Sequence, residues 1–212
     1  ERLYDLCAKI APRLHAMRVG RVIARPFAGE IGAFERTGNR KDYAMTPPQP
    51  VLSNWLQDAG HPVIGIGKIS DIFSGQGLDH SLTGSDMVLM QHLKDQFAQA
   101  ADGSFVFANF VEFDSLYGHR RDVAGYARAL EWFDRALASL LAAMKPDDLL
   151  ILTADHGNDP TWPGTDHTRE RVPVLCAGMG PKPLGLLGFE DVAATVATYL
   201  NVTPKGQGKS FL

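Results

Sequence analysis

The segment Leu149-Leu-Ile-Leu-Thr-Ala-Asp-His-Gly157 decides the fold prediction, because an apolar run of strand length passes directly into charged and polar side chains. Its first five residues predict a central β-strand. Comparable apolar runs cover Val63 to Gly67, Phe105 to Phe113 and, more briefly, Val172 to Cys176. Continuous apolar strands of this kind are typical of a parallel sheet that is buried on both faces.

Helical patterns separate these predicted strands. The clearest pattern runs from Tyr126 to Met144, where apolar residues recur at helical spacing until Lys145-Pro146 ends the helix. Further helices are expected over Leu3 to Met17, Val51 to Ala59, Asp86 to Ala98 and Asp191 to Leu200. Pro12 can kink or split the first of them. Strands that alternate with helices predict an α/β fold, with a mostly parallel sheet and helices on both faces.

The composition limits the classes of function. The 212 residues include 24 acidic and 21 basic side chains, and the resulting formal charge of −3 argues against a nucleic-acid-binding protein. No apolar run approaches the length of about 18 residues that a membrane span requires. The two cysteines, Cys7 and Cys176, are far apart and form no metal-binding or disulfide pattern. We therefore expect a reduced, cytoplasmic protein without membrane partners.

Five acidic and histidine side chains follow two of the predicted strands and are candidate metal ligands. They are Asp114, His119, Asp155, His156 and His167. In open α/β sheets, ligands bind outside the carboxyl ends of the strands, so these side chains are expected at one edge. A single histidine after a strand is more often a hydrogen-bonded loop residue, but five such groups together favour divalent metal binding. The set lacks cysteine and suits Mn²⁺, Zn²⁺, Fe²⁺ or Mg²⁺, and five ligands favour a pair of ions over one.

The first third of the chain carries basic residues that are candidate phosphate ligands. They are Arg21, Arg25, Arg36, Arg40 and Lys68. Arg21 and Arg25 are the first and last residues of a short predicted strand. Any one of them alone is more simply a surface cation. Lys68 is the strongest candidate, because it directly follows the predicted strand that ends at Gly67.

Long segments of the chain carry a resemblance to a known family. They are Gly20 to Phe27, Arg40 to Tyr43, Val63 to Phe73, Asp114 to Asp122, Thr153 to Arg169 and Lys205 to Leu212. These segments resemble the phosphopentomutases of the alkaline phosphatase superfamily. The resemblance implies an incomplete alkaline phosphatase-like core and part of an inserted α/β cap domain. Residues 1–45 would be the C-terminal part of the cap, and residues 46–212 the C-terminal part of the metal-binding core, with the proline cluster Pro47 to Pro50 at the boundary.

The same resemblance implies the roles of individual residues. Two Mn²⁺ ions are expected, one held by Asp155 and His156 and the other by Asp114, His119 and His167. Contacts to the sugar and phosphate are expected from Arg21, Ile23, Arg36 and Lys68. The small-molecule partners would be sugar phosphates, with a sugar bisphosphate as activator.

The resemblance further implies an isomerase of nucleoside catabolism that interconverts ribose 5-phosphate and ribose 1-phosphate, or the 2-deoxy pair. A phosphorylated threonine would carry the transferred group. This threonine and one more aspartate ligand are expected upstream of residue 1, so no catalytic nucleophile is expected in the chain, and the chain alone is expected to be inactive. Two alternatives are a metal-dependent phosphohydrolase of the same superfamily and a non-catalytic fragment with only a structural role.

Overall fold

The centre of the molecule is a three-stranded parallel sheet with the strand order β6-β5-β7. The computed structural model describes residues 1–212. The strands are β5 (Val63–Gly67), β6 (His80–Leu82) and β7 (Phe105–Asn109). Every residue of β5 is buried, as expected for a strand that pairs with a neighbour on each side.

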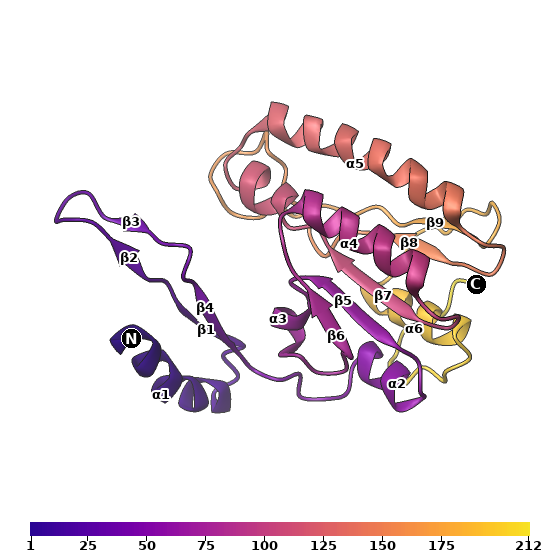
Figure 1. The fold of residues 1–212 in the computed structure, drawn as a ribbon, viewed down its shortest axis with the longest axis horizontal. Helices are drawn as coiled ribbons and strands as arrows, with labels where there is room; N and C mark the ends of the chain where they lie inside the picture. Colours follow the sequence, from indigo (N-terminus) through magenta and orange to yellow (C-terminus); the bar gives the residue numbers. More distant parts are fainter.

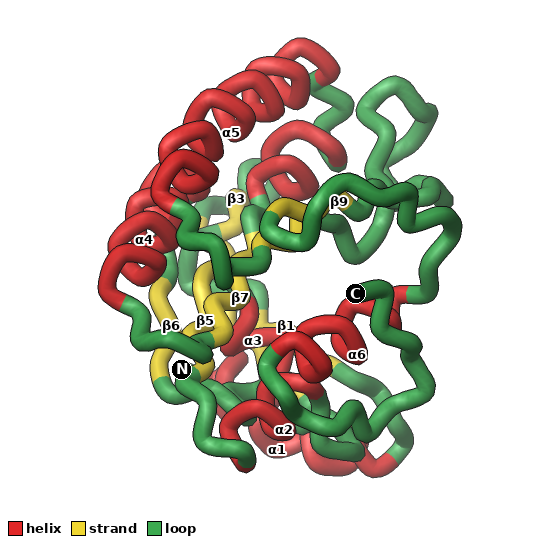
Figure 2. Tube along the Cα trace, turned by 90° about the vertical axis from the view of Figure 1, so that its right-hand side faces the viewer, coloured by secondary structure: helices red, strands yellow, loops and turns green.

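Helices cover both faces of this sheet, which confirms the predicted α/β class. One face carries α4 (Asp86–Gln99), and α5 (Val123–Ala143) packs against α4. The other face carries α2 (Leu52–Asp58), α3 (Ile69–Phe73) and α6 (Phe189–Tyr199). Figures 1 and 2 show the strands between these two groups of helices. None of the helices combines the length and the apolar content that crossing a lipid bilayer requires.

The alternation of side chains along β5 builds two core clusters. Val63 packs with Leu56 of α2 and Val196 of α6, whereas Ile64 and Ile66 pack with Leu89 of α4. Successive side chains of a strand point to opposite faces, so a single apolar strand can hold helices on both sides. The apolar run that the sequence shows at residues 63–67 therefore fixes both helical layers.

The pairing of the last two strands corrects the sequence prediction. β8 (Leu150–Leu152) was expected to be a central strand of a parallel sheet, but it pairs only with β9 (Leu175–Ala177), and the two run antiparallel. Parallel pairing needs a crossover, usually a helix. Residues 153–174 form a loop without a helix and return the chain in the opposite direction. The predicted strand from Val172 begins only at Leu175.

The third predicted strand is also shorter than expected. β7 ends at Asn109, not Phe113, because the backbone N–H groups of Val111 and Glu112 donate to the Asp86 carboxylate at 3.1 and 3.2 Å, not to a neighbouring strand. A π-helix, η1 (Phe113–Gly118), follows directly. In this part of the chain α3, β6 and η1 were not predicted, since none of them carries an apolar run of useful length.

Residues 1–44 form a separate set of elements beside the core (Figure 1). Helix α1 (Arg2–Ala16) is continuous through Pro12 and packs on the antiparallel pair β1 (Arg21–Ala24) and β4 (Lys41–Ala44). A second antiparallel pair, β2 (Phe27–Ala28) and β3 (Glu35–Arg36), extends away from them. A small apolar cluster of Cys7, Ala11, Val22 and Ala24 holds this part together.

Candidate metal centre

Three of the predicted ligands meet where η1 approaches the loop after β8. Ligand atoms of Asp114, His156 and His167 all lie within 4.8 Å of one another. The Nε2 atom of His167 is 3.2 Å from Oδ1 of Asp114, and the His156 and His167 rings stack with centroids 3.8 Å apart. The side chains of Asp114 and His167 are 29% and 47% exposed, so a cation can reach them from solvent.

His119 joins this cluster from the end of η1. Its Nε2 atom is 3.4 Å from Oδ2 of Asp114, and its ring stacks on His167 with centroids 4.8 Å apart. The Nδ1 atom lies 2.5 Å from the carbonyl oxygen of Thr165. A carbonyl only accepts hydrogen bonds, so Nδ1 carries a proton, and Nε2 is the ring nitrogen that faces Asp114. Fixing a ring tautomer in this way is typical of metal-binding histidines.

Asp155 lies at the edge of the cluster. Its carboxylate is 73% exposed and its Oδ1 atom is 3.8 Å from Nε2 of His156. The structure thus brings Asp114, His119, His156 and His167 together, with Asp155 adjacent to them through His156. The division of the five residues between two ions remains a prediction.

The chemistry of the cluster fits a divalent cation. Carboxylate oxygens and imidazole nitrogens without a thiolate suit hard to borderline ions such as Mn²⁺ and Zn²⁺. Burial, followed by the negative charges of Asp114 and Asp159, raises the pKa of Tyr126 above its ordinary value. A bound cation would offset the part of this shift that comes from the charge of Asp114.

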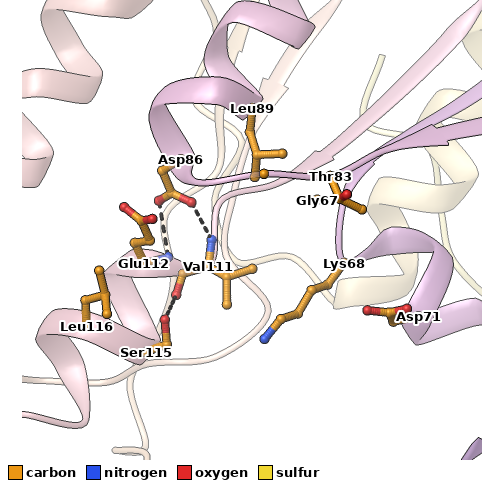
Figure 3. A pocket seen from close by; sticks show the side chains of 11 residues that line it. Gly67, Lys68, Asp71, Thr83, Asp86, Leu89, Val111, Glu112, Ser115 and Leu116 are labelled. Carbon is orange, nitrogen blue, oxygen red and sulfur yellow. Dashed lines mark hydrogen bonds between the residues drawn. The ribbon is translucent and has the colours of Figure 1, made fainter. Parts of the chain in front are cut away.

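Ser115 and Leu116 of η1 line a cavity of about 360 Å³, whose lining side chains are drawn in Figure 3. Lys68, the first residue after β5, extends into it, and the carboxyls of Asp86 and Glu112 line it as well. Burial, followed by the negative charge of Glu112, raises the pKa of Asp86 to about 6, although the two backbone hydrogen bonds from Val111 and Glu112 lower it. The ammonium of Lys68 is therefore the cationic group of a site that otherwise carries carboxyls.

Two of the predicted phosphate ligands share a neighbour. The carboxylate of Asp42 accepts two hydrogen bonds of 2.6 Å from Arg40 and lies 3.4 Å from Nη1 of Arg21. The hydrogen bond from Arg40, with the charges of Arg40, Arg21 and Lys68, holds the pKa of Asp42 below its ordinary value. Arg21 on β1 and Lys68 after β5 thus act on the same carboxylate although they are far apart in the chain.

The other two predicted contacts lie differently. Ile23 is on β1, where it is partly exposed and opposes Asp42 in the strand register. Arg36 is exposed on β3, in the strand pair that extends away from α3 (Figure 1). The structure therefore brings Arg21, Ile23 and Lys68 toward one region and leaves Arg36 apart from them.

The donor set and the α/β core agree with a comparison to known families. A family model described as the metalloenzyme superfamily matches residues 14–204. The chain belongs to the metalloenzyme superfamily. This membership agrees with the predicted alkaline phosphatase-like core. The structure of the PH0037 protein from Pyrococcus horikoshii resembles this metalloenzyme chain in fold, with a TM-score of 0.58 and 16% sequence identity. The match covers 82% of this chain and 59% of the PH0037 chain.

Curated relatives of this metalloenzyme chain are phosphopentomutases. The protein of Chromohalobacter salexigens is 51% identical, that of Shewanella pealeana 50% and that of Sinorhizobium medicae 50%. Each match includes the whole of this chain and 53%, 54% and 53% of the respective relative. The chain spans about half the length of the curated relatives that it matches.

Sequence reasoning missed two polar residues at the centre of this metalloenzyme site. Arg121 and Asn158 connect the loops that carry the candidate ligands, and neither is a metal ligand type that a search for carboxylates and histidines would select. The available signal was position: Arg121 follows His119 by two residues, and Asn158 follows His156 by two.

Proposed function

We propose that the protein is a phosphopentomutase that interconverts ribose 5-phosphate and ribose 1-phosphate, or their 2-deoxy forms, as an isomerase. The observation that carries the proposal is the convergence of Asp114, His156 and His167 within 4.8 Å, beside a cavity that contains Lys68. Identity of about 50% to three phosphopentomutases over the whole chain supports it. The transferred phosphoryl group would be carried by a threonine outside residues 1–212.

We propose two Mn²⁺ ions, one held by Asp155 and His156 and the other by Asp114, His119 and His167. Bound divalent ions would neutralise charge on the phosphoryl oxygens and on the attacking and leaving oxygens. The protein side chains supply the positioning: the Nδ1 contact of His119 to a backbone carbonyl fixes the nitrogen that it offers.

The substrate would be held through its second phosphate. Arg21 and Lys68 are the proposed phosphate ligands, because Arg21 lies 3.4 Å from Asp42 on β4 and Lys68 directly precedes α3, which contacts β4. Ile23 would contact the sugar from the same strand as Arg21, and Arg36 would reach the substrate only after a rearrangement of its strand pair. In this proposal residues 1–45 belong to the cap that closes over the sugar, and residues 46–212 belong to the core. A sugar bisphosphate would serve as the activator.

A metal-dependent phosphohydrolase would use the same cluster and differ only in admitting water. The two unpaired cysteines, Cys7 and Cys176, support a cytoplasmic location for either enzyme. A role in nucleoside catabolism is part of the mutase proposal, since pentose 1-phosphates are its substrates or products.

The test uses the full-length protein with Mn²⁺, a trace of sugar bisphosphate and ribose 5-phosphate. Ribose 1-phosphate and free phosphate are followed in the same reaction. Ribose 1-phosphate that forms without free phosphate supports the mutase. Free phosphate as the sole product would refute it and favour the hydrolase.

A matched pair of variants tests the substrate site. Lys68→Met is expected to raise the KM for ribose 5-phosphate at least about tenfold, because a hydrogen bond to a charged group is worth about 1.5–3 kcal/mol. Lys94→Met changes a lysine in a separate cavity between α4 and α5 and controls for the loss of a positive charge. An unchanged KM in Lys68→Met would remove Lys68 from the proposed site.

A further inference from the structure

We propose that Arg121, acting through Asn158, is the positioning residue that assembles the metal centre. The inference rests on the proposed metal binding of the same site. The Arg121 guanidinium donates to the carbonyl oxygen of Gly118 at 3.0 Å and to that of Asp166 at 2.6 Å. These carbonyls belong to the residues directly before His119 and His167. One side chain therefore fixes the backbone at both histidines.

The guanidinium also binds the loop between the two histidine-bearing segments. It donates to the carbonyl oxygens of Gly164 at 2.6 Å and Asp159 at 2.9 Å, and to Oδ1 of Asn158 at 2.6 Å. An arginine presents five N–H donors in a rigid planar fork, whereas a lysine presents three donors at a single point. Only the fork can reach acceptors that lie on both sides of the loop at once.

Asn158 links Arg121 to the candidate metal ligand Asp114 through hydrogen bonds. Its side chain is buried, with 8% of the residue exposed, and its Nδ2 atom donates to Oδ1 of Asp114 at 2.7 Å. The orientation of the amide follows from its neighbours, because the Arg121 guanidinium only donates and the Asp114 carboxylate only accepts. Arg121, Asn158 and Asp114 therefore form one continuous chain of hydrogen bonds to a candidate metal ligand.

The backbone of Arg121 supports a role beyond surface charge. Its φ is +55°, in the left-handed region that residues other than glycine seldom adopt. Such a conformation persists only where the surroundings determine it, and it is concentrated at functional sites. Arg120, the preceding residue, is exposed and makes none of these contacts, so it provides a control of the same residue type.

The test measures Mn²⁺ binding to the full-length protein by calorimetry and by the electron paramagnetic resonance spectrum of Mn²⁺, at a temperature where each variant is folded in EDTA. Arg121→Lys keeps the charge and loses the fork, and it is expected to weaken Mn²⁺ binding about 10- to 100-fold, as loss of an outer-shell partner does. Arg120→Lys is expected to bind within about twofold of the wild type. Asn158→Ala, which leaves the four carbonyl contacts of Arg121 in place, is expected to lose about tenfold.

The outcomes separate positioning from general stabilisation. A residue that only stabilises the fold would lower the melting temperature in EDTA but leave the Mn²⁺ affinity and spectrum of the folded protein unchanged, and that result overturns the inference. Equal losses in Arg121→Lys and Arg120→Lys would overturn it too. If Arg121→Lys does not fold, Asn158→Ala decides, and wild-type affinity in that variant overturns the inference.

The inference and the proposed function can fail separately. A wild type that binds Mn²⁺ but forms no ribose 1-phosphate would refute the mutase, while the affinities of the variants would still decide the role of Arg121. A wild type that binds no Mn²⁺ would overturn the inference.

Discussion

Replacing the buried carboxyl of Asp86 with an amide should change how the stability of the protein depends on pH. Asp86 is 5% exposed and accepts hydrogen bonds from the backbone of Val111 and Glu112, the two residues directly before η1. Burial, followed by the charge of Glu112, raises its pKa from 3.8 to about 6. The folded protein therefore holds a proton on this group at pH values where the unfolded chain has released it.

The sign and the size of the effect follow from linkage between protonation and folding. Each tenfold difference in proton affinity is worth about 1.4 kcal/mol, so a pKa raised from 3.8 to about 6 is worth about 3 kcal/mol. This contribution is fully present below pH 3.8 and is lost as the pH rises through about 6. Asp86→Asn removes the titration, so its stability relative to the wild type should increase by about 2.4 kcal/mol between pH 4 and pH 7, where most of the full range is lost.

The assay is urea unfolding of the metal-free wild type and Asp86→Asn, followed by circular dichroism at intervals from pH 4 to pH 7.5. The amide in Asp86→Asn also replaces one hydrogen-bond acceptor with a donor, which adds a stability change that does not depend on pH. The quantity to interpret is therefore how the difference in unfolding free energy between Asp86→Asn and the wild type changes with pH. Asp71→Asn, which alters an exposed carboxyl at the same cavity, controls for the loss of a negative charge. A stability difference between Asp86→Asn and the wild type that stays constant across this range would refute the reasoning.

Three further variants test the core, a strand end and the metal cluster. Leu56→Ala should lower the free energy of unfolding by about 2–5 kcal/mol, because Leu56 is fully buried against Val63 and Val196; a loss below about 1 kcal/mol in urea unfolding would contradict this packing. Gly67→Ala should cost more than about 1 kcal/mol in the same assay, since Gly67 has a φ of +81° and its new Cβ would collide with the carbonyl of Asn109. Gly164→Ala shares the φ of +81° but has open space around the Cβ, so an equal loss there would show that the collision is unimportant. His167→Ala should weaken Mn²⁺ binding by more than about tenfold in calorimetry, whereas His80→Ala, outside the cluster, should not. Equal Mn²⁺ affinities in these two variants would remove His167 from the metal centre.

The sequence by itself determined the α/β class and most of the helices and strands. An apolar run such as Val63 to Gly67, and the helical spacing that becomes α5, are local patterns that stay interpretable without knowledge of their neighbours. The general rule that ligands gather at strand ends also selected Asp114 and the three histidines of the cluster, because residue type and position after a strand are both visible in the sequence.

Only the tertiary structure decided how the chain ends its strands and holds its ligands. β7 stops at Asn109 because Asp86, 25 residues before Val111, accepts the backbone hydrogen bonds that a longer strand would use. Arg121 meets Asn158 across 37 residues, and Asn158 meets Asp114 across 44. Such contacts leave no periodicity in the sequence, since they arise between segments that only the folded chain brings together.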